Sequence, residues 1–145
     1  MFIGEYQHTL DTKNRIIIPA RFREGLGERF VLTKGMDTSL FVYPMQEWLT
    51  LEQKLRALSF TKRDVRAFVR MFFSGAVEGE LDKQGRVTLS AGHKRHASII
   101  KEAVIIGVSS RVEIWAKERW EDYMQSENMD YDQLSEKMSE FDLDL

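Results

Sequence analysis

The chain of 145 residues contains no cysteine, only two prolines and no long apolar run. The absence of cysteine excludes disulfide bonds and zinc sites built from thiolates, and it fits a reducing compartment. No apolar stretch approaches the roughly 20 residues that a membrane-spanning helix needs. Residues 1–5 also lack the basic and apolar layout of a signal peptide. We therefore expect a soluble, cytoplasmic protein that does not contact a membrane.

The chain has little net charge, −2 at neutral pH, but its charges are unevenly divided. Residues 1–117 carry 19 lysines and arginines against 13 acidic residues, whereas residues 118–145 carry 2 against 10. A basic body with an acidic end suggests a nucleic-acid partner, although acidic ends also aid solubility. The pattern predicts an acidic helix over 130–141 with three apolar residues on one face. This helix could dock on its own subunit, dock on a neighbour, or lie in solvent.

What the chain does contain is an internal repeat. The segment LDTKNRIII at residues 10–18 returns 71 residues later as LDKQGRVTL at residues 81–89. With one extra residue allowed in the second copy, Trp48 matches Trp120. Each copy reads as strand, turn, strand, short helix, two strands and a helix. Each copy alone would be marginally stable, so we expect the two either to share one core or to pair with copies of themselves.

The repeat predicts four parts of the chain. The first unit covers 1–50, connecting helices cover 51–74, the second unit covers 75–122, and the acidic tail covers 123–145. Apolar stripes at helical spacing place the connecting helices at 44–58 and 61–73.

The turn in each copy has the chemistry of a tight hairpin. Asp11 and Asp82 can accept hydrogen bonds from backbone N–H groups a few residues on. Asn14 and Gly85, which stand before the two arginines, are the residue types that most readily adopt positive φ. These three residues, Asp11, Asp82 and Gly85, are therefore predicted to organise the loops.

The arginines that follow, Arg15 and Arg86, have two possible roles. Each can pair with its own aspartate and brace the turn, or each can present its guanidinium to guanine edges or phosphates. Both roles can hold together if the aspartate orients an arginine that it does not fully neutralise.

These residues resemble the MraZ family, the bacterial transcriptional regulators encoded at the start of the division and cell-wall gene cluster. That family carries two AbrB-like units, each with an Asp-x-x-x-Arg signature, which here are Asp11 to Arg15 and Asp82 to Arg86. The resemblance extends to MFIG at residues 1–4, IPARFR at 18–23 and FFSGA at 72–76.

The resemblance implies a mainly β, α+β fold. Its tandem repeat would form a pseudo-dimeric, swapped-hairpin β-barrel of the AbrB type, with helices after each half. It also implies that chains assemble into rings and bind repeated promoter elements on double-stranded DNA upstream of their own operon. The second unit departs from the family at Ser90, Gly92 and His93, where relatives more often have a proline and an apolar residue.

The candidate DNA-binding residues are basic or lie in the loops. They are Arg15, Arg86, Lys13, Lys83, Asn14, Arg21 and Arg23. Lys94 and Arg95 are further possible phosphate contacts. Phosphate contacts position a protein on DNA, and any single one of these side chains could equally be simple surface charge.

No cofactor, metal or small-molecule substrate is predicted. His93 and His96 have a spacing that could place them on one helix face, but no third metal ligand stands near them, so polar surface is the expectation. The sequence shows no nucleophile–base pair, no paired carboxylates in a pocket and no phosphate-cradling glycine loop. The chain is therefore not expected to be an enzyme.

The function predicted from these observations is sequence-specific DNA binding by a transcriptional regulator at the nucleoid. It would act as a ring-like homo-oligomer, in which several modest contacts add up by avidity. Two alternatives stay open, namely an antitoxin-like AbrB-fold binding module and a structural assembly protein with incidental basic loops.

Overall fold

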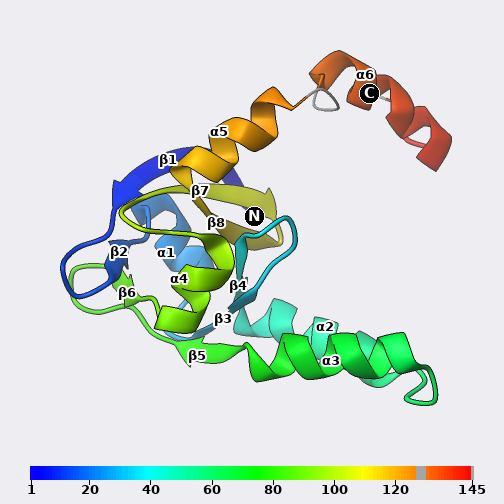
Figure 1. Ribbon diagram of the computed structural model, residues 1–145, viewed down its shortest axis with the longest axis horizontal. Coiled ribbons are helices and arrows are strands. Elements are labelled where there is room, and N and C mark those ends of the chain that lie inside the picture. Colours follow the sequence, from blue (N-terminus) through cyan, green and yellow to red (C-terminus); the bar gives the residue numbers. More distant parts are fainter. Residues whose placement is uncertain (127–129, 145) are drawn as a thin grey trace.

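The computed structural model describes residues 1–126 and 130–144, and it is an α+β fold (Figure 1). The elements of the body are β1 (Phe2–Thr9), β2 (Arg15–Ile17), α1 (Ala20–Leu26), β3 (Phe30–Lys34), β4 (Leu40–Pro44), α2 (Met45–Arg56), α3 (Arg63–Ser74), β5 (Val77–Gly79), β6 (Arg86–Thr88), α4 (Ala91–Ala97), β7 (Glu102–Ser109), β8 (Arg111–Ala116) and α5 (Lys117–Gln125). The short helix α6 (Tyr131–Lys137) and the 3₁₀ turn η1 (Met138–Phe141) follow.

The two copies of the repeat exchange strands. A six-stranded antiparallel sheet has the order β1-β7-β8-β4-β3-β5, so β1 of the first unit pairs with β7 of the second. In the same way β5 of the second unit pairs with β3 of the first. The strands β2 and β6 pair with each other in a second sheet, which we call the β2–β6 ribbon. Neither unit therefore completes a sheet with its own strands alone.

A pseudo-twofold axis relates the two units. When each strand is replaced by its repeat partner, the order β1-β7-β8-β4-β3-β5 becomes β5-β3-β4-β8-β7-β1, which is the same order read from the other edge. The axis passes through two pairs of residues that the repeat itself makes equivalent. Ile16 lies opposite Val87 in the β2–β6 ribbon, and Phe41 lies opposite Glu113 between β4 and β8.

The resemblance predicted a closed β-barrel, and this prediction is wrong for the structure. In the described residues the six-stranded sheet ends at β1 and β5, and the β2–β6 ribbon remains a separate sheet. Each strand of the ribbon has three residues, and the first ends just before Ile18 and Pro19 lead into α1. Proline has no N–H to donate and ends the ladder after β2, while β6 ends at the equivalent position, where Leu89 and the N-cap Ser90 lead into α4.

The core between the two sheets contains residues from both units. Fully buried members include Phe22, Phe30, Ile105 and Ile114. This shared core explains why the exchange of strands is stable, because it removes the apolar faces of both units from water at once.

The other face of the large sheet carries two separate aromatic clusters. Under α2 and α3, Trp48 stacks on Phe72 with ring centroids 5.4 Å apart. Under α5, Trp115 contacts Trp120 and Tyr123 at centroid distances of 5.2 and 4.9 Å. The recurring aromatic residues of the repeat thus fix one helical layer to each half of the sheet.

The helices between the two units lie close to their predicted positions. The helices predicted over 44–58 and 61–73 are α2 over 45–56 and α3 over 63–74. Figure 1 shows them side by side as a hairpin that extends from the body. The predicted unit boundaries remain a prediction.

The acidic end forms α6 and η1, within the range predicted for its helix. The helix α5 ends at Gln125. In Figure 1, α6 stands beyond the outer end of α5 and away from the sheets. Among the described residues, none of the helices has the length and apolar character required to span a membrane.

Candidate nucleic-acid interface

The β2–β6 ribbon has one buried and one outer face. Ile16 is fully buried and Val87 is 6% exposed, and both face the core. Because side chains alternate along a strand, the neighbouring positions point outward. These outer residues are Arg15, Ile17, Arg86 and Thr88, with Arg15 opposite Thr88 and Ile17 opposite Arg86. The strand exchange therefore places the two signature arginines on one small surface.

The turn before β2 is built around the carboxylate of Asp11. Its Oδ1 accepts hydrogen bonds from the backbone N–H groups of Lys13 and Arg15, both at 2.9 Å. Its Oδ2 accepts from Nε of Arg15 at 2.6 Å. One carboxylate thus holds both the backbone of the turn and the side chain of the arginine.

The turn before β6 repeats this arrangement. Oδ1 of Asp82 accepts from the N–H groups of Gln84 and Arg86 at 2.9 Å, and Oδ2 accepts from Nε of Arg86 at 2.8 Å. In both turns the aspartate thus accepts hydrogen bonds from backbone donors two and four residues on.

These hydrogen bonds favour the ionised carboxylates. The N–H of Arg15 is the largest cause that holds the pKa of Asp11 below its ordinary value, and the arginine side chain adds to it. The N–H of Arg86 lowers the pKa of Asp82 in the same way. Both aspartates are therefore anionic at neutral pH, which fixes the turns.

The two turns are locked to each other across the ribbon. Asn14 and Gly85 have φ values of 60° and 77°, as the sequence predicts for the residues before the arginines. Their carbonyls accept hydrogen bonds from the opposite unit, from Leu89 N–H to Asn14 at 2.8 Å and from Ile18 N–H to Gly85 at 2.9 Å. The left-handed conformation aims each carbonyl at the other strand, so neither turn can move independently.

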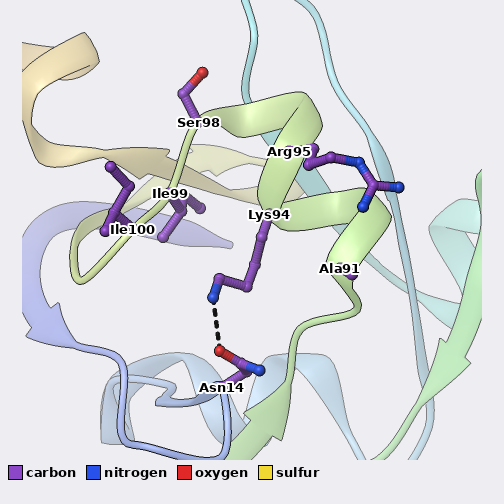
Figure 2. A pocket seen from close by; sticks show the side chains of 7 residues that line it. All are labelled: Asn14, Ala91, Lys94, Arg95, Ser98, Ile99 and Ile100. Atoms are coloured by element: carbon purple, nitrogen blue, oxygen red, sulfur yellow. Dashed lines mark hydrogen bonds between the residues drawn. The ribbon is translucent and has the colours of Figure 1, made fainter.

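A basic side chain from the other unit covers each turn. Lys94 on α4 donates to the side-chain oxygen of Asn14 at 2.6 Å, as Figure 2 shows. Its repeat partner, Arg23 on α1, lies over Gly85 and donates through Nε to the carbonyl of Ile18 at 3.0 Å. A Cβ at Gly85 would overlap the guanidinium of Arg23 where it lies here, so a larger residue at this position would displace that side chain.

Each aspartate orients its arginine but binds only part of the guanidinium. The side chains of Arg15 and Arg86 are 28% and 23% exposed. Each donates to its aspartate through Nε, and within the described part of the chain their Nη atoms make no hydrogen bond. Nη1 of Arg86 also lies 3.7 Å from Oδ2 of Asp11, so the carboxylate of Asp11 contacts both arginines. Bracing and presentation are thus compatible in this geometry.

The remaining candidates surround the ribbon. Lys13 and Lys83 are exposed in the two turns, and Arg21 is exposed on α1. Beside the first turn lies an open hollow of about 380 Å³ (Figure 2). Its lining residues are Asn14, Ala91, Lys94, Arg95, Ser98, Ile99 and Ile100.

The prediction for His93 is wrong, because this side chain is only 4% exposed. His93 is the repeat partner of the buried Phe22, and its Nε2 lies 2.6 Å from the carbonyl of Gly75. A hydrogen bond replaces the apolar packing found in the first unit. His96 is partly buried with Nε2 3.0 Å from the carbonyl of Gly35, and the described residues contain no cluster of potential metal ligands.

The comparison with protein families fits this geometry. The family described as "MraZ protein, putative antitoxin-like" matches the chain twice, over residues 1–71 and 72–142. The chain belongs to the MraZ family. The tandem MraZ repeat accounts for the two equivalent turns and for the exchange of strands between them.

Curated members of the MraZ family are similar over nearly the whole chain. A protein of Moorella thermoacetica is 59% identical over 143 residues, which are 99% of this chain and 100% of the relative. One of Pelotomaculum thermopropionicum is 59% identical over 99% of both chains, and one of Clostridium tetani is 57% identical over 97% and 98%. All three are named "Transcriptional regulator MraZ", and the prediction of a non-enzymatic protein is confirmed at the level of the family.

Sequence reasoning missed two members of the outer face, Ile17 and Thr88. The alternation of side chains places Ile17 on the same face as Arg15, and this signal was present in the sequence. Which face of each strand is buried, and that the two strands pair, follows only from the exchange between the units.

Proposed function

We propose that this protein is a transcriptional regulator of the cytoplasm and nucleoid that binds double-stranded DNA sequence-specifically through the β2–β6 ribbon. It acts on repeated promoter elements upstream of the division and cell-wall gene cluster, including its own gene. The observation that carries the proposal is the pairing of two Asp-x-x-x-Arg turns, which brings Arg15 and Arg86 together on one outward face.

A two-stranded ribbon is one of the elements that the major groove of B-DNA admits. An arginine can donate two hydrogen bonds to O6 and N7 of a guanine. Among the described residues the Nη atoms of Arg15 and Arg86 donate no hydrogen bond, and the only ion-pair contact of these atoms is the one between Nη1 of Arg86 and Asp11 at 3.7 Å. Ile17 and Thr88 lie beside them and offer methyl groups to thymine. The outer face thus combines polar and apolar base readers.

The charges around the ribbon suit the DNA backbone. Lys13, Lys83 and Arg21 are exposed near its two turns, and Arg23 and Asn14 hold the turns in place. Phosphate contacts of this kind fix the register of a protein on the duplex without reading its sequence. We assign the lysines and Arg21 to phosphates and the paired arginines to bases.

The protein acts as a ring-like homo-oligomer in this proposal. Large apolar side chains are exposed on the α2–α3 hairpin, and contiguous exposed apolar surface marks an interaction site. They are Leu49, Leu58, Phe60, Phe68 and Met71. Several ribbons in one assembly can engage several promoter repeats at once, which raises affinity by roughly 10²–10⁴ without new contacts.

The test is footprinting on the DNA immediately upstream of the protein's own gene, with binding to that fragment and to a scrambled fragment measured at several salt concentrations. We expect protected, regularly spaced repeats and much tighter binding to the native fragment. Equal affinities with equal salt slopes would mean purely non-specific phosphate binding and would refute the proposal. Sedimentation of the wild-type chain tests the assembly, since a single species near 17.0 kDa would exclude it.

The second candidate function is that of an antitoxin-like binding module, and the description of the MraZ family as antitoxin-like favours it. An antitoxin of this kind would still bind DNA, but it would also hold a toxin protein through a segment outside the ribbon. Retention of promoter binding together with a tight complex with one unrelated small protein would support this candidate. Promoter binding by the chain alone, with no such partner, supports the regulator.

A further inference from the structure

Two exposed apolar surfaces are not used by DNA binding. The first is on the C-terminal arm, residues 130–144, where Tyr131 is 80% exposed, Phe141 72% and Leu143 49%. The second is on the α2–α3 hairpin, residues 45–74, where Phe60 and Met71 are 54% and 67% exposed. Exposure of large apolar side chains to water is unfavourable in free energy, and exposed apolar patches mark interaction sites, so we expect each surface to bind a partner.

The two surfaces have opposite charge. The hairpin carries six lysines and arginines against three acidic residues, a net charge of +3. The arm carries six acidic residues against one lysine, a net charge of −5. In the described part of the chain, Lys62, Arg63 and Arg70 of the hairpin form no ion pair. Apolar residues surrounded by complementary charges are the pattern of a specific interface.

The hairpin also offers a hollow that suits an apolar side chain. A groove of about 180 Å³ lies between α2 and α3. Its lining is Glu52, Leu55, Arg56, Phe60, Val69 and Phe73. The apolar floor can take a phenylalanine or leucine of the arm. The two charged residues of the lining, Glu52 and Arg56, pair with each other at 2.7 Å.

The arm and the hairpin of one chain lie apart. The helix α5 is fixed to the sheet by the contacts of Trp120 and Tyr123 with Trp115. In Figure 1 the arm extends to the upper right of the body and the hairpin to its lower right, and the two are separated in this view. Within the described residues, no hydrogen bond or ion pair joins them. A second copy of the chain, in contrast, can bring its arm to the hairpin without any change in either body.

We propose that the C-terminal arm of one chain docks on the α2–α3 hairpin of a second copy, with Phe141 or Leu143 in the groove. The contact is head-to-tail, because the arm and the hairpin are two different surfaces of the chain. Such a contact can repeat from chain to chain, so the arm and the hairpin would be the two surfaces that form the interfaces of the proposed homo-oligomer. The inference rests on that part of the proposal and not on DNA binding.

The absence of cysteine makes site-directed cross-linking a direct test. Ser139→Cys places one thiol on the arm, and Ser59→Cys places one at the tip of the hairpin beside the groove; both serines are exposed. The two full-length variants are mixed at micromolar concentration and treated with a short bismaleimide. We expect roughly tenfold more covalent heterodimer than with the control Glu28→Cys in place of Ser59→Cys, because docking holds the thiols at millimolar effective concentration.

Charge exchange tests the chemistry of the contact. The change Lys62→Glu with Arg63→Glu in the hairpin chain should lower the heterodimer yield roughly tenfold, and Glu140→Lys with Asp142→Lys in the arm chain should restore it. A yield equal to the Glu28→Cys control would overturn the proposal. So would failure of the exchanged charges to restore the yield, or a chain with both cysteines that closes on itself instead of linking to a second copy.

The outcomes separate this contact from the proposed function. Oligomers in sedimentation without arm–hairpin cross-links would remove the docking contact and leave the assembly standing. A monomer would remove both, and promoter binding is measured independently of either.

Discussion

Replacement of Arg15 by alanine separates the two roles of the signature arginine. The change removes one guanidinium from the outer face of the β2–β6 ribbon and one hydrogen bond to Asp11. It leaves Oδ1 of Asp11, which holds the backbone of the turn through the N–H groups of residues 13 and 15. We therefore expect the turn and the ribbon to keep their conformation.

The expected magnitudes differ widely between stability and binding. The ion pair of Arg15 and Asp11 is partly exposed and screened by solvent, so the melting temperature should stay within about 5 °C of the wild type. A bidentate arginine–guanine contact contributes about 1–3 kcal/mol of discrimination, which is a factor of roughly 5 to 150 in affinity for the specific site. In an assembly the loss is multiplied over the subunits that contact DNA.

The assay compares the affinity for the promoter fragment and for scrambled DNA, each at several salt concentrations. Arg15→Ala should lose the preference for the promoter. The matched control is Arg21→Ala, which removes an exposed arginine of α1 that we assign to phosphate. This control should weaken binding to both DNAs alike and lower the salt slope by about 1.

Two results would refute the reasoning about Arg15. A variant that melts far below the wild type would show that the guanidinium mainly braces the ribbon. A variant with unchanged preference for the promoter would show that Arg15 does not read bases. Arg15→Lys adds a further check, because lysine keeps the charge but cannot form the forked contact to guanine.

Three further changes test the fold. Gly107→Ala should lower the free energy of unfolding in urea by about 2–3 kcal/mol, because the new Cβ would lie 2.4 Å from backbone atoms of β1. Gly92→Ala in α4 should be neutral or slightly stabilising, because its Cβ would make only ordinary van der Waals contacts. His93→Ala should cost about 2–4 kcal/mol in the same assay, and a cost near zero would mean that the side chain lies at the surface after all. Since the folded state lowers the pKa of Asp11 and Asp82, their stabilising effect is complete above about pH 4 and lost as the pH falls through the folded-state values. The free energy of unfolding, measured from pH 6 down to pH 2, should therefore fall less steeply below about pH 4 in the double variant Asp11→Asn/Asp82→Asn than in the wild type. Identical pH profiles of the two proteins would contradict the assignment.

The local structure of the site could be predicted from the sequence because its causes are local. An aspartate followed by a residue that tolerates positive φ and an arginine defines a tight turn, and both turns have the expected geometry. The apolar stripes of α2 and α3 are equally local, and these helices lie where the spacing predicts them. The resemblance to the MraZ family added the tandem repeat, which the exchange of strands reflects.

What the sequence could not give depends on contacts between distant residues. Two contacts join the units, one between Arg23 and Gly85 and one between Lys94 and Asn14. The spacing of these residues along the chain does not predict either contact. His93 was misplaced because a histidine beside two basic residues reads as surface. Its burial depends on a carbonyl 18 positions earlier, at Gly75, that accepts its hydrogen bond. The open ribbon in place of a barrel likewise depends on how far strand pairing extends in space.

The pair of Phe41 and Glu113 on the pseudo-twofold axis has a consequence for how this fold can evolve. In a homodimer of identical subunits, a position on the axis always faces its own copy, so an acidic residue there would face another carboxylate. Here both copies stand in one chain, and the two sides of the axis can differ. Glu113 is only 6% exposed, and it binds Arg111 at 2.7 Å and the indole N–H of Trp115 at 3.0 Å, while Arg111 also lies over the ring of Phe41. Fusion of the two units has thus opened the axial positions to heterologous pairs that mutation of a symmetric dimer could never reach.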